Sequence, residues 1–253
     1  MDTITITNNK TAVLLYGEYR QFDIAIKSWD FLLEYDFYCS LWDTSHQYNK
    51  KLNIDYFQNI NKDSIINFHK NSNVVLHNEN IFSNKSELIN KSRNFKSLFH
   101  WKSCIDLLYK SNIKYDKIIL MRPDIHLSLL KDFKHIDFEN KIFTANNFNS
   151  CELTSDLFVH DAIIMGSFES INYLINSFEN DESLNHNSIA LKILNSKFKN
   201  HNINEYINFQ IIRPNVRNHP EQTPAVIDYC YREWANTHCE EDILFLDKKY
   251  NGN

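Results

Sequence analysis

Three short apolar runs constrain the fold of this chain more than any other feature of its sequence. They cover residues 11–16, 37–42 and 117–121, and each stops at a glycine or a charged residue. A continuous apolar run of this length indicates a strand buried on both faces, as in a parallel sheet. Apolar side chains in residues 21–34 recur every three or four positions, which predicts a helix between the first two runs. The sequence therefore predicts βαβ units and an α/β fold: a mixed, mostly parallel sheet flanked by helices.

The rest of the chain continues this alternation. Further strands are expected at residues 74–76, 141–144, 161–165 and 209–212, and further helices at 86–111, 170–178 and 188–198. Residues 45–73 are polar and predict one short helix. Residues 213–253 contain three prolines and predict an irregular tail that folds back on the sheet. Repeats and linkers rich in Gly, Ser or Pro are absent from the sequence, which favours a single domain over residues 1–253.

Composition excludes several classes of protein. Aromatic residues make up 14% of the chain, more than a disordered segment would contain. The formal net charge is −5 and basic residues form no stripe, so we expect no nucleic-acid partner. The five cysteines are scattered and never in a CxxC spacing, which favours buried thiols in a reducing compartment. With a polar start and no apolar run near the ~18 residues of a membrane span, the sequence predicts a cytoplasmic protein without a signal peptide.

Charged and aromatic side chains follow the predicted strands where an α/β sheet binds its ligands. In such sheets the binding site lies beyond the carboxyl ends of the strands. Residues 17–20, 42–43 and 122–126 occupy these positions, and Asp161 lies in a further candidate segment. Arginines there can bind phosphate, and carboxylates can bind a divalent cation. Glycine-rich phosphate loops, dinucleotide fingerprints and HExxH are all absent from the sequence, which makes the corresponding enzyme classes poor candidates.

Four blocks of the sequence, taken in order, resemble a family of small viral and bacterial glycosyltransferases with the GT-A fold. YDKIILMRPDI at residues 115–125 is similar to the strand followed by RPD in that family. VLLYGEYR at 13–20, FYCSLWD at 37–43 and DAIIMGS at 161–167 are similar to three other blocks of the family. The resemblance implies a metal-dependent hexosyltransferase, with a nucleotide-binding core at 11–180 and acceptor-side helices and tail at 181–253. By family habit, the donor would be a UDP-sugar and the acceptor a glycan or another hydroxyl compound.

The resemblance also implies roles for individual residues. The nucleotide would be bound at the ends of the first two strands, by Tyr16, Gly17, Glu18, Arg20, Trp42 and Asp43. Arg122 would steady the leaving group, with Arg93 and Lys102 of the long helix near the diphosphate and Lys96 on the same helix. Asp161 would serve as general base or hydroxyl anchor for the acceptor. Asp156 and His160 receive no role.

The resemblance further implies a bound Mn²⁺ or Mg²⁺ at the DxD-type segment. Asp124 would be its ligand or contact the ribose of the nucleotide, and His126, which stands where the family motif has a second aspartate, is a further candidate ligand because imidazole can bind such metals. A histidine from the tail could complete the ligand set, and His219 is favoured over His186 and His238 because it follows Arg213 and Arg217.

Other interpretations of these residues stay open. An aspartate after a proline commonly caps a turn, an aromatic side chain is most often core, and basic residues on a helix are most often solvated. At the level of function, the alternatives are a catalytically inactive protein that binds nucleotide-sugars or glycans, and a nucleotidyltransferase. The last normally has a basic glycine-rich loop after its first strand, whereas residues 17–20 are too short and too acidic.

Overall fold

The structure is a computed structural model of the chain. This structure describes residues 10–19, 25–49, 54–68, 72–78, 93–132, 136–146, 159–178, 184, 186–214 and 225–228. Side chains are described for most of these residues, with gaps that include 45–49, 54–58 and 210–214.

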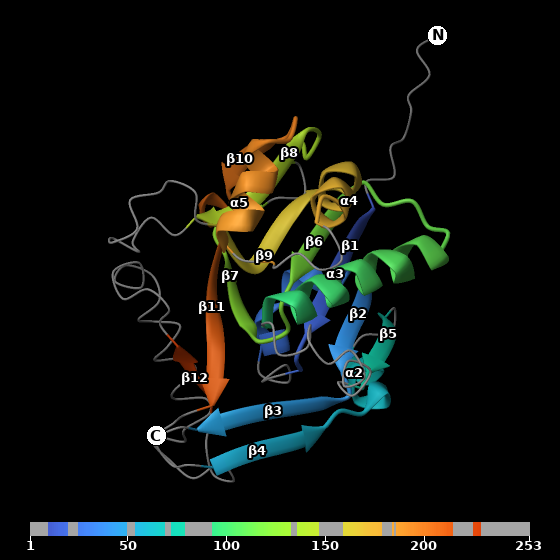
Figure 1. Cartoon of the computed structure of the whole chain (residues 1–253), viewed down its shortest axis with the longest axis vertical. Helices are drawn as coiled ribbons and strands as arrows, with labels where there is room; N and C mark the ends of the chain where they lie inside the picture. Colours follow the sequence, from blue (N-terminus) through green and yellow to red (C-terminus); the bar gives the residue numbers. More distant parts are fainter. Residues whose placement is uncertain are drawn as a thin grey trace.

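A seven-stranded sheet forms the centre of the molecule (Figure 1). Its order is β10 (Lys199–Asn202), β8 (Lys141–Asn146), β9 (Val159–Ser167), β6 (Lys117–Met121), β1 (Thr11–Gly17), β2 (Asp36–Trp42) and β5 (Ser72–His77). Neighbouring strands are parallel except β9, which runs antiparallel to both β6 and β8. The prediction of an α/β fold with a mixed, mostly parallel sheet is confirmed.

Both faces of the sheet are covered, as the predominantly apolar runs predict. Alternate residues of β1 belong to two different clusters, with Leu14 in one and Leu15 in the other. Helices α3 (Arg93–Lys110), α4 (Phe168–Asn176) and α5 (His186–Leu194) cover the Leu14 face. The Leu15 face is covered by residues 25–32, α2 (Lys62–Phe68), β7 (Ile125–Leu129) and β11 (Ile207–Pro214). The result is a three-layered arrangement with the sheet in the middle.

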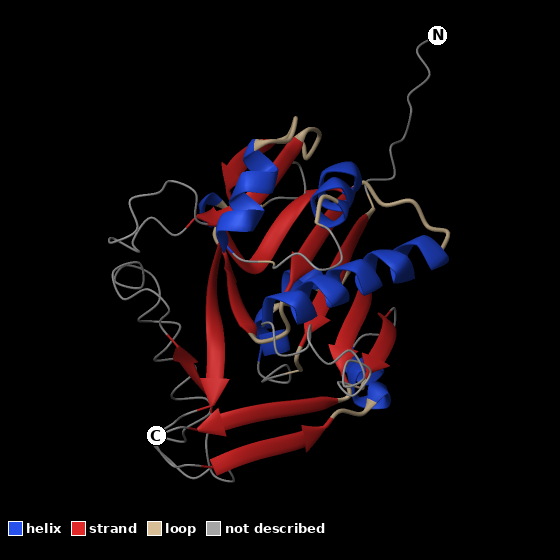
Figure 2. Cartoon of the chain, viewed as in Figure 1, coloured by secondary structure: helices blue, strands red, loops and turns tan. Residues whose placement is uncertain are grey.

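Two smaller sheets complete the fold (Figure 2). Strands β12 (Ala225–Asp228), β11 and β7 form an antiparallel sheet, and β3 (Thr44–Asn49) pairs with β4 (Ile54–Asn59) in an antiparallel hairpin. The sequence predicts neither the hairpin nor β7 and β10. In the tail, β12 pairs with β11, so residues 225–228 form a strand instead of the irregular structure expected there.

The prediction of one helix over residues 21–34 is wrong for residues 26–34, within the part of this range that the structure describes. After Ala25 the chain forms two 3-10 turns, Ile26–Ser28 and Asp30–Leu32. The Trp29 indole donates to the carbonyl of Ile125 at 2.9 Å, and the Ser28 hydroxyl accepts from the amide of Leu127 at 3.0 Å. These bonds tie the segment to β7, and tertiary contacts override the helical period. The helix expected at 188–198 also ends earlier, at Leu194.

The described parts also bear on the cysteines and on membrane insertion. Cys39 and Cys104 are buried thiols, which fits the expectation for these two. The other three cysteines lie outside the described residues. None of the described helices combines the length and the hydropathy needed to cross a membrane.

Gly166 on β9 lies close to the side chain of Ser170 and to the main chain of Lys141. A Cβ there would collide with the Ser170 hydroxyl and lie 3.1 Å from the carbonyl oxygen of Lys141. We expect Gly166→Ala to lower the free energy of unfolding by about 1–3 kcal/mol, measured by urea denaturation. The penalty should shrink in a Ser170→Ala background, because the hydroxyl is then gone. Equal penalties in both backgrounds would show that the other two close neighbours, the Lys141 carbonyl and the Ile171 side chain, set the cost.

Candidate active site

Three strands bring polar side chains together at one edge of the sheet. Strands β1 and β6 are parallel and end there, with Leu15 opposite Met121. Because β9 is antiparallel, it begins at the same edge: the amide of Arg122 donates to the carbonyl of Ala162 at 2.9 Å. The Tyr16 hydroxyl donates to the main-chain carbonyl of Asp161. Residues from three distant parts of the sequence therefore meet at the carboxyl end of the central strands.

Arg122 and Asp124 form a two-pronged ion pair at this edge. Arg122 Nε lies 2.9 Å from Asp124 Oδ1, and one terminal nitrogen lies 2.6 Å from Oδ2. The side chain of Arg122 is 20% exposed, whereas that of Asp124 is only 2% exposed. Burial alone would lower the pKa of Arg122, but attraction to Asp124, and then to Asp161, outweighs it and raises the pKa. The guanidinium therefore stays charged and is held in a fixed orientation by the turn after β6.

Tyr16 is a buried hydrogen-bond donor at the end of β1. Burial raises its pKa well above the usual value, the charge of Asp161 raises it further, and the nearby Arg122 only partly opposes this. The ring packs edge-on against Trp101, with centroids 5.6 Å apart. Tyr16 thus keeps its proton and fastens the start of β9 to the end of β1.

The sequence-derived metal site does not assemble among the described residues. Both carboxylate oxygens of Asp124 are already bonded to Arg122. His126 lies in β7, opposite Gln210 of β11, and is 9% exposed. The described part of the chain contains no group of three or more His, Cys, Asp or Glu side chains placed to hold a metal ion. These residues do not fit a bound Mn²⁺ or Mg²⁺.

An aromatic cluster lies where β2 and β5 end. The ring of Trp42 stacks on Phe99 with centroids 5.9 Å apart and meets His100 edge-on at 4.2 Å. The ammonium of Lys96 lies 5.9 Å from the centre of the Trp42 ring. Lys96, Phe99 and His100 all belong to the first half of α3, so this helix places a cation and aromatic rings beside Trp42.

Asp43 follows Trp42 and offers an acceptor at the same edge. Its Oδ2 accepts from the side chain of Asn78 at 2.9 Å, whereas its buried Oδ1 has no hydrogen-bond partner among the described residues. Its main chain is fixed on both sides, by the carbonyl of His77 and the amide of Ile60. A ligand with an N–H group can therefore supply the missing partner.

Beneath this edge lies a histidine network, partly buried, that the sequence does not predict. The hydroxyl of Ser40 lies 2.8 Å from Nδ1 of His100 and 3.2 Å from Nε2 of His77, which is also 3.1 Å from the Ser103 hydroxyl. Burial, together with the neighbouring His77, lowers the pKa of His100 to about 3. These residues come from β2, β5 and α3, and the sequence carries no spacing signal that links them.

The other predicted site residues are not part of the Arg122–Asp124 pair or of the aromatic cluster among the described side chains. Gly17 ends β1 with φ +101°, a conformation that favours glycine, and Glu18 follows it. Lys102 donates to the carbonyl of Phe178 at 3.0 Å and so joins α3 to the end of α4. The backbones of Arg93, His160 and His186 lie in α3, β9 and α5, but their side chains are outside the described structure. Arg20, Asp156, His219 and His238 lie outside the described residues altogether.

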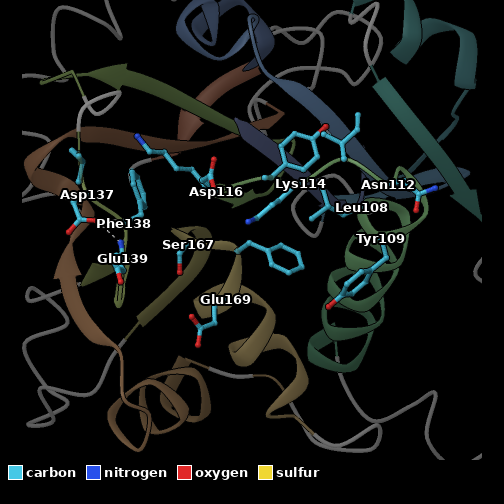
Figure 3. Close-up of a pocket in the computed structure, with 15 residues that line it drawn as sticks. Leu108, Tyr109, Asn112, Lys114, Asp116, Asp137, Phe138, Glu139, Ser167 and Glu169 are labelled. Carbon is cyan, nitrogen blue, oxygen red and sulfur yellow. Dashed lines mark hydrogen bonds between the residues drawn. The ribbon is translucent and has the colours of Figure 1, made fainter. Parts of the chain in front are cut away.

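A cavity of about 930 Å³ lies at the opposite edge of the sheet (Figure 3). It is lined by the end of α3, the start of β6 and the junction of β9 with α4, and Figure 3 shows Asp116, Ser167 and Glu169 among its lining. Lys117 begins β6 and Arg122 follows its end, so this cavity is separated from the Arg122–Asp124 pair by the length of that strand. It contains none of the predicted site residues.

Comparisons with solved structures find distant likenesses. No protein-family model and no curated protein matches the sequence. The galactosyltransferase LgtC, solved with donor and acceptor sugar analogues, is 9% identical, with 76% of this chain and 73% of that chain covered and a TM-score of 0.43.

Two further solved structures are similar to a comparable degree. A nucleoside-diphosphate-sugar pyrophosphorylase from Vibrio cholerae is 10% identical (76% and 90% covered, TM-score 0.43). The glycosyltransferase GlyE from Streptococcus pneumoniae is 12% identical (77% and 45% covered, TM-score 0.39). Because all three TM-scores are below 0.5, the activities in these names describe the three proteins and are not transferred to this chain.

Proposed function

We propose that this chain is a glycosyltransferase that moves a sugar from a nucleotide-sugar donor, a UDP-sugar by preference, to a hydroxyl group of a glycan or similar acceptor. The observation that carries the proposal is the meeting of Arg122, Asp124 and Asp161 with Tyr16 at the carboxyl edge of the sheet. The resemblance of the four sequence blocks to small glycosyltransferases supports the same assignment. The hexosyl nature of the sugar and the cytoplasmic location belong to the proposal as well.

Arg122 is suited to the donor end of this reaction. A guanidinium has five N–H donors, and Asp124 uses two of them. The rest can bind diphosphate oxygens and stabilise the negative charge that grows on the leaving nucleoside diphosphate. Asp43, which follows β2 at the same edge, has a buried Oδ1 without a hydrogen-bond partner among the described residues, and this oxygen is a candidate acceptor for the base.

Asp161 is suited to the acceptor end. In the proposed step an acceptor oxygen bonds to the anomeric carbon while the bond from that carbon to the diphosphate oxygen breaks. The proton of the acceptor hydroxyl passes to the carboxylate of Asp161, and the leaving nucleoside diphosphate keeps the electron pair of the broken bond. The half-buried position of Asp161 beside Arg122 keeps both ends of the reaction at one edge.

The Mn²⁺ or Mg²⁺ that the sequence resemblance implies plays no part in this mechanism. Both carboxylate oxygens of Asp124 accept hydrogen bonds from Arg122, and the described residues do not fit a metal ion at this position. His219, the suggested third ligand, lies outside the described residues.

One observation favours a second candidate, a protein that binds a nucleotide-sugar without turning it over. The carboxylate of the DxD-type segment is occupied by an arginine, and His126 replaces its second aspartate. Such a protein would keep the donor site and release neither free sugar nor glycoside. A nucleotidyltransferase is distinguished by its release of pyrophosphate.

A thermal-shift screen of the purified protein tests the proposal. The ligands are UDP, GDP, CMP and their sugars, because a ligand that binds only the native state raises the melting temperature. We expect one nucleotide and its sugar to raise it, and incubation of that donor with acceptor glycans to yield a glycoside and free nucleoside diphosphate. Binding with no turnover favours the inactive binding protein. No shift with any of these ligands contradicts the proposed function.

Asp161→Asn separates binding from transfer. The bond from Tyr16 goes to the main-chain carbonyl of Asp161, so the substitution leaves that contact in place. We expect donor affinity to stay within about twofold, and the turnover number for glycosyl transfer to fall by about 10²- to 10⁴-fold, as is typical when a general base is lost. The measurements are calorimetric titration with the nucleotide and a product assay. Unchanged transfer would remove Asp161 from the mechanism.

A further inference from the structure

The closed ion pair between Arg122 and Asp124 bears on how this site compensates the charge of a diphosphate. A divalent cation such as Mg²⁺ requires about six oxygen ligands at about 2.0–2.1 Å and retains several waters. The Asp124 side chain is 2% exposed, and each of its oxygens already accepts a bond from the same guanidinium. An ion that used these oxygens would have to enter a site that is closed to solvent and lie beside a fixed positive charge.

Arg122, in contrast, faces solvent in part while its partner does not. The guanidinium is bonded on one side to a buried carboxylate, and Asp161 adds a second negative charge nearby. A ligand that arrives at the edge meets the remaining N–H groups of Arg122 and does not meet the oxygens of Asp124. Lys96 lies over Trp42 at the end of β2, two strands from β6, and adds a second cation to the same edge of the sheet.

We infer that Arg122 takes the place of a divalent cation in this site, so that a nucleotide-sugar binds through its diphosphate without added metal. Asp124 acts as a positioning residue: it orients the guanidinium and does not touch the donor. The inference rests on the proposed function, because it concerns the same donor site, and it reverses the role that the sequence resemblance implies for Asp124.

The test compares donor affinity with and without divalent ions in three proteins. Wild type, Arg122→Lys and Asp124→Asn are titrated calorimetrically with the UDP-sugar or other donor found in the thermal-shift screen. Each titration is done in excess EDTA and again in excess Mn²⁺ or Mg²⁺. Arg122→Lys keeps the charge, and with it the compensation of Asp124, but loses the two-pronged geometry. Lys197→Arg, in an exposed ion pair with Glu169 on another part of the surface, is the matched control and should bind as wild type does.

We expect wild type to bind the donor with the same affinity, within about twofold, in EDTA and in metal. Arg122→Lys should weaken binding about tenfold or more, since a charge-assisted pair of hydrogen bonds to phosphate is lost. Asp124→Asn should weaken it less than Arg122→Lys does, and equally in both conditions. Melting curves without ligand show whether either variant has lost its fold, and a role of Asp124 in stability alone would leave its donor affinity unchanged.

Two results overturn the inference, and they differ from failure of the proposed function. In the first, the donor binds only in the presence of Mn²⁺ or Mg²⁺ and Asp124→Asn binds it most weakly. Asp124 would then be a metal ligand, and the proposed donor site would be retained. Donor affinity that Arg122→Lys leaves unchanged would remove Arg122 from the site. Absence of binding by wild type in every condition contradicts the donor site itself, and the inference falls with it.

Discussion

Arg122→Met is expected to lower the free energy of unfolding by about 3–5 kcal/mol, the usual cost of removing one partner from a buried ion pair. The variant leaves the carboxylate of Asp124, 2% exposed, without the guanidinium that compensates its charge. Methionine fills much of the same volume, so the loss reflects the charge more than a cavity. Urea unfolding followed by far-ultraviolet circular dichroism gives the difference.

The double variant Arg122→Met/Asp124→Asn is the control for this prediction. It removes both charges and keeps the shape of the aspartate, so most of the lost stability should return. Recovery would show that the ion pair orients Arg122 more than it stabilises the protein. If the double variant is as unstable as Arg122→Met, the cost comes from the packing of the arginine stem, and the uncompensated carboxylate is not its cause.

The second large effect concerns acid. His100 has a pKa near 3 in the folded protein because of burial and the nearby His77, against 6.5 for an ordinary histidine. Between these values the unfolded chain binds a proton that the folded protein excludes, so stability falls as the pH decreases from about 6.5 toward 3. The full shift corresponds to about 5 kcal/mol at most. The free energy of unfolding, measured by urea denaturation at a series of pH values, reports this loss.

His100→Gln tests the assignment, because an amide cannot titrate in this range and can still bond to Ser40. We expect its stability to depend less on pH below 6.5 than that of wild type. His77→Gln is the matched comparison: burial lowers the pKa of the half-buried His77 as well, so the same change there should flatten the curve to a smaller extent. Identical curves for His100→Gln and wild type would assign the acid sensitivity to other groups.

The sequence predicts the central sheet well because burial on both faces leaves a local trace. Residues 11–16, 37–42 and 117–121 are predominantly apolar, and each run lies inside a strand of the large sheet. The hairpin of β3 and β4 leaves no such trace, since both strands consist largely of polar residues. Strand β7 begins directly after the RPD turn, in a stretch where the sequence predicts a motif and no strand.

The residues at the strand ends were predictable as a group, but their contacts were not. The rule that ligands lie at carboxyl ends singles out Arg122, Asp124 and the segment of Asp161, and the family resemblance adds Tyr16. The antiparallel direction of β9 brings Asp161 to the others. That Arg122 bonds to Asp124, instead of leaving it open to an ion, depends on rotamers and on the geometry of one turn. The histidine network was invisible for a similar reason: Ser40, His77 and His100 meet only through the packing of α3 on β2 and β5.

The position of β1 in the middle of the sheet also affects how the protein is made. Its partners are β2, a short distance along the chain, and β6, which begins only at Lys117. At translation rates of about 5–20 residues per second, the ribosome completes β6 roughly 5 to 20 s after β1. Until then one hydrogen-bonding edge of an almost wholly apolar strand has no partner, so we expect the nascent chain to depend on chaperones during synthesis, and short fragments that end before residue 117 to aggregate.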